Sequence, residues 1–191
     1  MVDLAVATQE ETFERMEGPL ADRGIEVHGI QPKERTFDLS AVGEFEGFDA
    51  GFVYPPRIME GAVVYARLGV PWVNDREAVL TSRNKAGALA TLGAAGIPVP
   101  ETVVVSDPVT EDELREAFGR FDPPVVVKPN SATRGIGVTK VGDLDSFLGV
   151  CDYLDLVHDY RATGDKAFLL QEYLPGARDF RAMTIGGEYA G

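Results

Sequence analysis

The chain has 191 residues, and its 45% hydrophobic and 26% charged residues are typical of a globular protein rather than a disordered one. Its formal net charge of −13 argues against nucleic acid or an anionic membrane as a partner. The single cysteine cannot form an internal disulfide bond, and the first residues lack the pattern of a signal peptide, so we expect a cytoplasmic protein.

The first 80 residues alternate between strand-like and helix-like segments. Strands are predicted at residues 4–8, 25–30, 48–54 and 70–74, and helices at about 8–22 and 59–68. This alternation predicts a small parallel α/β layer. We interpret His28 as a structural or exposed residue, because the sequence shows no second histidine, cysteine or carboxylate cluster with it.

A longer helical segment follows from Asp75 to Ala95 and contains Lys85. Taken alone, Lys85 would be interpreted as a solvated side chain on a helix. The chain has only five lysines, however, and its acid-rich, lysine-poor composition resembles that of halophilic proteins, so each lysine is a candidate for a specific role. A proline-rich connection at 97–100 then leads to a predicted strand at 102–105 and to a helix that begins at Thr110.

The stretch from Val125 to Val141 has the clearest functional signal. It predicts a buried strand that ends at Lys128 and a second strand that begins at Val138. Between them, Gly135 and Gly137 allow the backbone to approach a ligand closely, and the free N–H groups of such a loop form a cradle for an anion. Lys128 would stand at the base of this cradle as a positive charge for phosphate. The alternative is an ordinary glycine-containing hairpin.

This pattern excludes two familiar nucleotide-binding motifs. A P-loop needs a lysine directly after its last glycine and opens a helix, which does not occur here. The dinucleotide fingerprint also leads from a strand to a helix, whereas Gly137 leads into a strand-like segment. Kinases cover a triphosphate with a strand, a glycine loop and a strand, yet no H-R-D or D-F-G motif follows in this chain.

The last part of the chain returns to short strands. A helix is predicted from Asp143 to about His158 and a strand at 168–174. Residues 179–185 then pair with 188–191 through two glycines, the residue type that a two-residue hairpin turn requires. Because a lone hairpin with an apolar edge invites pairing with other chains, a homo-oligomer is among the expected states.

Eight short segments stand in the order and spacing found in ATP-grasp ligases. They are Pro56–Ile58, Asn74, Arg83–Lys85, Gly96–Pro100, Val125–Pro129, Arg134–Val138, Gln171–Tyr173 and Asp179–Arg181. The chain from Asn74 to Gly191 resembles most closely the RimK-type amino-acid ligases, which add glutamate to a carboxylate-bearing acceptor.

The resemblance implies an α/β fold with an α+β lid. It implies an N-terminal Rossmann-like pre-ATP-grasp domain at 1–80, a linking helix and connection at 81–100, an ATP-grasp lid with the glycine loop at 101–175, and the start of a C-terminal ATP-grasp subdomain at 176–191. Since members of the family continue past this point, we expect the chain to lack the C-terminal part of the fold together with the family's metal ligands. No metal ligand is predicted before Gly191.

The resemblance also implies which residues bind ATP. The predicted nucleotide-binding residues are Lys85, Lys128, Thr133, Gly135, Ile136, Gly137, Gln171, Glu172, Tyr173, Leu174 and Asp179. The two lysines match family lysines that contact phosphate, the loop residues match a mobile loop over the phosphates, residues 171–174 match the hinge that reads adenine, and Asp179 matches an acid that binds ribose. Lys128 and Arg134 are the predicted catalytic residues. Arg57 is a candidate for binding an acceptor carboxylate, although an arginine in a turn beside two prolines has other uses.

We therefore predict an ATP-dependent carboxylate–amine ligase that works through an acyl phosphate, or the nucleotide-binding portion of one. ATP and Mg²⁺ (or Mn²⁺) are the implied cofactors. A small-molecule or protein carboxylate acceptor and an amino acid are the implied partners. The alternative is a non-catalytic module that binds nucleotide or a partner and derives from a truncated ATP-grasp chain. In both cases the 191-residue chain alone is expected to be inactive.

Overall fold

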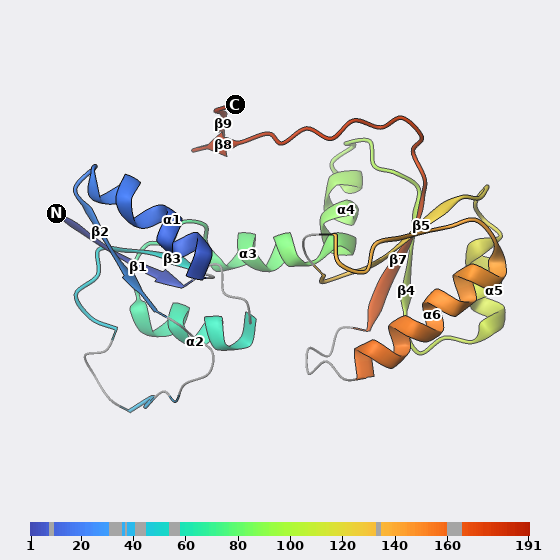
Figure 1. The fold of residues 1–191 in the computed structure, drawn as a ribbon, viewed down its shortest axis with the longest axis horizontal. Coiled ribbons are helices and arrows are strands. Elements are labelled where there is room, and N and C mark those ends of the chain that lie inside the picture. Colours follow the sequence, from blue (N-terminus) through green and yellow to red (C-terminus); the bar gives the residue numbers. More distant parts are fainter. Residues whose placement is uncertain are drawn as a thin grey trace. The chain divides into compact units, whose positions relative to one another are not determined.

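The computed structural model describes residues 1–7, 10–30, 36, 38–40, 45–53, 58–132, 135–159 and 166–191. These residues form two compact units, Met1–Ala88 and Leu89–Gly191, whose elements are labelled in Figure 1. The boundary between the units falls inside one helix, and the four-part domain division expected from the sequence stays a prediction. Within the described ranges, no helix is both long enough and apolar enough to cross a membrane.

The first unit contains a three-stranded parallel sheet in the order β2–β1–β3. The strands are β1 (Val2–Ala7), β2 (Ile25–Gly29) and β3 (Ala50–Val53), and helices α1 (Glu10–Ala21) and α2 (Ile58–Leu68) lie on opposite sides of them (Figure 1). The predicted parallel α/β layer is confirmed. Its core is formed by small residues of β1, such as Ala5 and Ala7, together with Val64 and Leu68 of α2.

The predicted fourth strand, at residues 70–74, is reduced to a single parallel bridge between Gly51 and Trp72. The Gly51 N–H donates to the carbonyl of Pro71 at 2.9 Å, and the Val73 N–H donates to the carbonyl of Gly51 at 2.8 Å. The indole of Trp72 covers Gly51 so closely that an added Cβ would lie 2.3 Å from the ring. A side chain at Gly51 is therefore excluded by the packing of Trp72.

The helix predicted over 75–95 consists of two helices, α3 (Arg76–Arg83) and α4 (Lys85–Ala94). Asn84 separates them, with an extended backbone at φ −113° and ψ 91°. Its side-chain oxygen accepts a hydrogen bond from the Gly87 N–H at 2.9 Å, as a helix-capping residue does. The cap begins a new helix at the residue after Asn84, so Lys85 is the first residue of α4.

The second unit contains a four-stranded antiparallel sheet in the order β4–β7–β5–β6. The strands are β4 (Thr102–Ser106), β7 (Ala167–Glu172), β5 (Val125–Pro129) and β6 (Thr139–Val141), and helices α5 (Glu111–Phe118) and α6 (Leu144–Asp159) lie on one side of them (Figure 1). Together with the parallel unit, this sheet confirms the expected α/β fold with an α+β lid.

One face of the antiparallel sheet forms the core of the second unit. Val125 and Val127 of β5 are fully buried on this face, and Phe147 of α6 is fully buried against it. The rings of Phe118 and Phe147 stack at 5.2 Å between centroids, which joins α5 to α6. Helix α5 begins with the capping box predicted at Thr110, whose hydroxyl accepts a hydrogen bond from a backbone N–H of the first turn.

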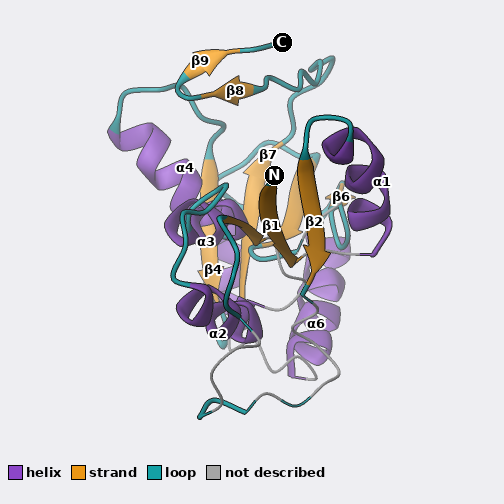
Figure 2. Ribbon diagram, turned by 90° about the vertical axis from the view of Figure 1, so that its left-hand side faces the viewer, coloured by secondary structure: helices purple, strands orange, loops and turns teal. Residues whose placement is uncertain are grey.

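The last two strands, β8 (Thr184–Ile185) and β9 (Glu188–Tyr189), form a hairpin at the predicted turn, with strands shorter than the predicted pairing of 179–185 with 188–191 (Figure 2). Thr184 pairs with Tyr189 and Ile185 pairs with Glu188, so the turn consists of the two glycines between them. All four strand residues are exposed.

Candidate functional site

Polar side chains gather on the face of the antiparallel sheet that α5 and α6 leave uncovered. Side chains alternate along β5, so Val126 and Lys128 point away from the core that contains Val125 and Val127. Gln171 of β7 is the register partner of Val126, and on its other side it pairs with Thr102 of β4. The pairing therefore places Thr102, Gln171 and Lys128 on one surface.

Three hydrogen bonds in series connect these residues. The Lys128 ammonium donates to Gln171 Oε1 at 2.6 Å, and Gln171 Nε2 donates to Thr102 Oγ1 at 2.7 Å. The Thr102 hydroxyl in turn donates to the carbonyl of Pro100 at 2.9 Å. Because the donors and acceptors run in one direction, the amide orientation of the buried Gln171 is fixed and its oxygen faces Lys128.

The electrostatic state of Lys128 favours an anionic ligand. The side chain is half-buried, and burial lowers the pKa of its ammonium from the usual value because the charged form loses hydration. The hydrogen bond that Lys128 donates to Gln171 Oε1 replaces part of the lost hydration without supplying a negative charge. A phosphate oxygen placed near Lys128 Nζ would supply that charge and would form a charge-assisted hydrogen bond.

The glycine loop follows directly after β5. Gly135 and Gly137 both have positive φ angles, 72° and 76°, and the Val138 N–H donates to the carbonyl of Gly135 at 3.2 Å. An added Cβ at Gly137 would lie 2.8 Å from Cγ of Pro129, whereas the space around Gly135 is open. The two positions therefore need glycine for different reasons. At position 137 both the positive φ angle and the close contact with Pro129 require glycine, whereas at position 135 only the positive φ angle does. The predicted loop residue Ile136 is exposed.

The predicted adenine hinge begins where β7 ends. Glu172 joins this end of β7 to the residue before β4, since its N–H donates to the Glu101 carbonyl at 3.0 Å and its carboxylate accepts from the Glu101 N–H at 2.7 Å. Tyr173 and Leu174, which follow, are both partly exposed. The Lys140 ammonium lies 3.8 Å from the centroid of the Tyr173 ring, a distance at which a cation–π interaction is favourable.

The sequence did not identify Thr102 as a site residue, nor did it connect Lys140 with the predicted adenine hinge. Thr102 completes the hydrogen-bond series, and Lys140 contacts Tyr173. Alternation along each strand indicates which face a residue occupies, but the register that joins different strands was needed to place these two residues beside Gln171 and Tyr173.

Of the other predicted site residues, the structure describes Lys85 and Asp179. Lys85 is half-buried at the start of α4 and belongs to the unit Met1–Ala88. Asp179 is exposed between β7 and β8. Arg57, Thr133 and Arg134 lie outside the described residues.

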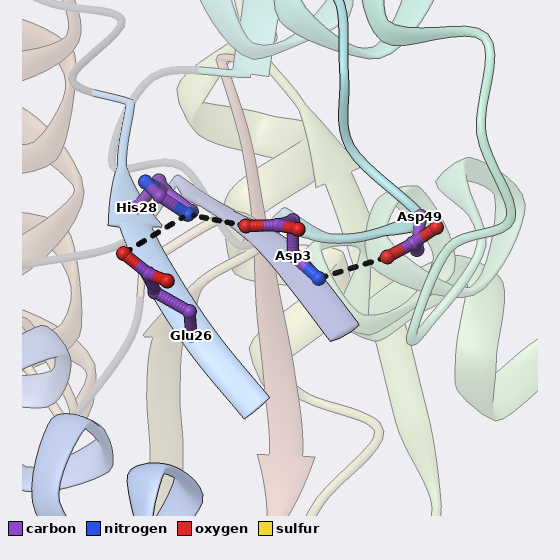
Figure 3. Close-up of polar contacts among 4 residues, drawn as sticks. All are labelled: Asp3, Glu26, His28 and Asp49. Carbon is purple, nitrogen blue, oxygen red and sulfur yellow. Dashed lines mark hydrogen bonds and ion pairs between the residues drawn. The ribbon is translucent and has the colours of Figure 1, made fainter. Parts of the chain in front are cut away.

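A second polar cluster lies in the first unit, and it contradicts the interpretation that His28 has no carboxylate cluster with it. His28 Nε2 is 3.0 Å from Asp3 Oδ1 and 3.9 Å from Glu26 Oε1 (Figure 3). Glu26 and His28 are two residues apart on β2 and so share a face, a signal that the sequence contained. Asp3 joins them only because β1 pairs with β2, which the sequence did not specify.

Comparison with known proteins shows which class of protein shares this fold. No protein-family model matches the chain. The RimK domain ATP-grasp protein from Sphaerobacter thermophilus superposes with a TM-score of 0.69 and 25% identity, over 92% of this chain and 66% of that one. D-cycloserine synthetase DcsG, at 20% identity and a TM-score of 0.66 over 90% of this chain and 59% of that one, shares the fold. By fold, the chain is therefore an ATP-grasp protein.

Similarity to curated proteins identifies the family within the ATP-grasp superfamily. The tetrahydromethanopterin:alpha-L-glutamate ligase of Methanosarcina acetivorans is 33% identical over 159 residues, which cover 78% of this chain and 44% of that protein. The alpha-aminoadipate–LysW ligase LysX of Sulfurisphaera tokodaii is 29% identical over 131 residues, 66% of this chain and 43% of that protein. The chain thus spans less than half the length of these relatives. Within the ATP-grasp superfamily, the chain belongs to the RimK type, and the resemblance found in its sequence is confirmed.

Proposed function

We propose that this chain is the nucleotide-binding portion of an ATP-dependent carboxylate–amine ligase. The observation that supports this proposal best is the half-buried Lys128, which is the penultimate residue of β5 and donates a hydrogen bond to Gln171. The loop that follows β5 contains two glycines with positive φ angles. A desolvated cation at the base of such a loop is suited to the phosphates of ATP. The relatives of this chain are ligases by their names, which supports the same proposal.

In the proposed reaction, a substrate carboxylate attacks the terminal phosphorus of ATP, which forms an acyl phosphate and releases ADP. The amine of an amino acid then attacks the acyl carbon, an amide bond forms and inorganic phosphate leaves. No side-chain nucleophile is required, so the chain would contribute position and charge. Lys128 would hold a phosphate oxygen and neutralise charge that develops during the transfer, and the N–H groups at Gly135 and Gly137 would cover the same phosphates.

The remaining residues receive roles within this proposal. Lys85 would be the second phosphate lysine, Arg134 would assist the transfer, and Thr133 and Ile136 would belong to the covering loop. The backbone of residues 171–174 would read adenine. Asp179 would bind ribose hydroxyls, and Arg57 an acceptor carboxylate. Mg²⁺, bound largely through phosphate oxygens, would further neutralise the triphosphate.

The acceptor is proposed by chemical class. The two relatives act, by their names, on LysW and on tetrahydromethanopterin. We propose a small-molecule or protein acceptor with a free carboxylate, and glutamate or another amino acid as the amine. The second candidate is a module that binds nucleotide without catalysis. Release of phosphate from ATP that depends on an added amino acid and acceptor would separate the ligase from this module.

The test is a titration of the chain with ATP in the presence of Mg²⁺, compared among the parent, Lys128→Ala and Lys140→Ala. Loss of a charge-assisted phosphate contact should weaken binding by about 1.5–3 kcal/mol at Lys128, roughly 10- to 150-fold. The Lys140 variant removes the same charge from the next strand and should lose much less. Equal losses in both variants, or no loss at Lys128, would remove the phosphate role.

A further inference from the structure

Three side chains that are typical metal ligands converge in the first unit, away from the glycine loop in the sequence. Asp3, Glu26 and His28 each offer one ligand atom, and these atoms lie within 4.8 Å of one another (Figure 3). Two are carboxylate oxygens and one is an imidazole nitrogen. Within the described ranges, these three are the histidine, cysteine or acidic side chains whose ligand atoms come this close together as a group.

The sheet brings these residues together and holds them. In the parallel pairing of β1 and β2, Asp3 is the direct partner of Glu26, and Ala5 is the partner of His28. Since Ala5 has only a methyl side chain, the imidazole can extend across β1 toward Asp3. The ring of Phe48 packs edge-on against the imidazole at 5.5 Å between centroids, and the Asp3 backbone exchanges two hydrogen bonds of 2.9 Å with Asp49.

The spacing of the ligand atoms is close to what a tetrahedral metal ion needs. Bonds of 2.0–2.2 Å to nitrogen and oxygen place neighbouring ligand atoms about 3.4 Å apart in a tetrahedron. The observed separations from His28 Nε2, 3.0 Å to Asp3 and 3.9 Å to Glu26, lie on either side of this value, so small rotations of the carboxylates would suffice. All three side chains are partly exposed, which leaves a path for an ion to enter.

Electrostatics also favours a cation at this position. Asp3 and Glu26 are directly opposite each other on neighbouring strands, and like charges in such pairs destabilise a sheet. A divalent ion between them would replace this repulsion with attraction. The imidazole nitrogen selects ions such as Zn²⁺ over Mg²⁺, which prefers an environment of oxygen atoms alone.

We propose that Asp3, Glu26 and His28 form a site for a divalent transition-metal ion of the zinc class, with water as the fourth ligand, which joins β1 to β2. Asp3 and Glu26 are the second residues of β1 and β2, so the two carboxylates lie near the amino-terminal ends of these strands. His28 is the fourth residue of β2, and its Nε2 lies 3.0 Å from Asp3 Oδ1. Substrates of parallel α/β sheets bind at the opposite, carboxyl-terminal ends, so the metal site is distinct from a substrate site of this sheet. Its role is to fix the register of the first two strands.

The experiment uses the whole chain, freed of metal with a chelator and then titrated with Zn²⁺ against a chromophoric competitor. We expect one equivalent to bind to the parent, and at least a tenfold loss of affinity in His28→Gln and in Asp3→Asn. The matched control is Asp49→Asn, which removes a neighbouring negative charge but keeps an acceptor for the Asp3 N–H, and it should bind as the parent does. A hundredfold excess of Mg²⁺ should not displace the Zn²⁺.

A spectroscopic readout keeps the test decisive if a variant fails to fold. The chain has two histidines, so imidazole nitrogen spectra of the parent contain two sets of ring signals, which His158→Gln assigns. Zn²⁺ should shift the His28 set and leave the His158 set in place. The absence of any bound equivalent, or binding that leaves the His28 signals unmoved, would show that the cluster is only a hydrogen-bonded group and would overturn the proposal.

Discussion

The two sheets of this protein present polar side chains for different structural reasons. In the antiparallel sheet, one face is covered by helices, and Lys128 and Gln171 belong to the other face, where alternation along each strand puts them. In the parallel sheet, helices lie on both faces (Figure 1), and Asp3 and Glu26 become neighbours near the strand ends through the pairing of β1 with β2.

This difference determines what each polar group depends on. Lys128 stays on its face as long as β5 is a strand with Val125 and Val127 in the core. The cluster around His28 depends in addition on the register of two strands, and a slip by one residue would move Glu26 to the opposite face. The position of Lys128 on the candidate nucleotide face is therefore a property of one strand, whereas the candidate metal site is a property of a pair of strands.

Among the substitutions that test this comparison of the two sheets, the largest loss of stability is expected in the hydrophobic core of the second unit. Phe147→Ala removes a fully buried ring and should cost about 3–5 kcal/mol of the free energy of unfolding. Leu156→Ala on the same helix, at 59% exposed, is the control and should cost far less. The chain's one tryptophan, Trp72, lies in the other unit, so urea unfolding followed by circular dichroism should shift while the Trp72 fluorescence transition stays in place. Coincident shifts of both signals would show that the two units unfold as one.

A smaller effect is expected at the edge of the parallel sheet. Gly51→Ala places a Cβ within 2.3 Å of the Trp72 ring, and the displacement of the ring should cost about 1–3 kcal/mol. Gly18→Ala in α1 is the matched control: it meets no atom within 4 Å, so the better helix propensity of alanine should raise stability slightly. Urea unfolding followed by Trp72 fluorescence measures both. An unchanged midpoint for Gly51→Ala would mean that the ring moves away without cost.

The antiparallel sheet was the more predictable of the two. Val125–Lys128 was predicted as a buried strand that ends at Lys128, and the capping box at Thr110 is a local signal. The break at Asn84 was missed because apolar residues continue on both sides of it, and only the side-chain cap interrupts the helix. The strand at 70–74 was overestimated, because apolar composition does not reveal that Trp72 turns its ring onto Gly51.

The residues of the two candidate sites also differ in how far the sequence alone could identify them. Lys128 and the glycines could be found because strand, loop and strand are consecutive in the chain. Thr102 lies 69 residues from Gln171, and Asp3 lies 25 residues from His28, so neither contact is encoded in a local pattern. Such contacts follow from strand order and register, which depend on the packing of the whole sheet.

The glycine loop offers a test in which binding and folding separate. Gly135→Ala forces a left-handed backbone on alanine in open space, which should cost about 1 kcal/mol and weaken ATP binding. Gly137→Ala adds the contact with Pro129 and should lower the melting temperature further. Melting temperatures and ATP titrations of both variants check this. If Gly135→Ala melts as low as Gly137→Ala, the backbone angle alone dominates and the packing on Pro129 is unimportant.

The smallest expected effect is a pair of opposite pH dependences within the second unit. Burial first, and then the neighbouring Asp155 carboxyl, raise the pKa of Asp107, whereas hydrogen bonds from the backbone N–H and the hydroxyl of Thr110 lower the pKa of Glu113. A raised pKa in the folded state means that Asp107 contributes stability below its unfolded value of 3.8 and that this contribution is lost as pH rises through the folded pKa. For Glu113, the contribution is present above its unfolded value of 4.5 and is lost as pH falls through the folded pKa.

The measurement is urea unfolding of Asp107→Asn, Glu113→Gln and the parent from about pH 3 to pH 7, a range that spans the titration of both carboxyls. Each variant is compared with the parent at the same pH, so the titration of all other groups cancels. The stability of Asp107→Asn relative to the parent should rise with pH, because asparagine keeps a donor toward Asp155 and cannot ionise. The stability of Glu113→Gln relative to the parent should fall with pH, because the capping box loses the carboxylate that accepts from Thr110. Slopes of the same sign in both variants would mean that overall charge, rather than the two local environments, governs the pH dependence of this unit.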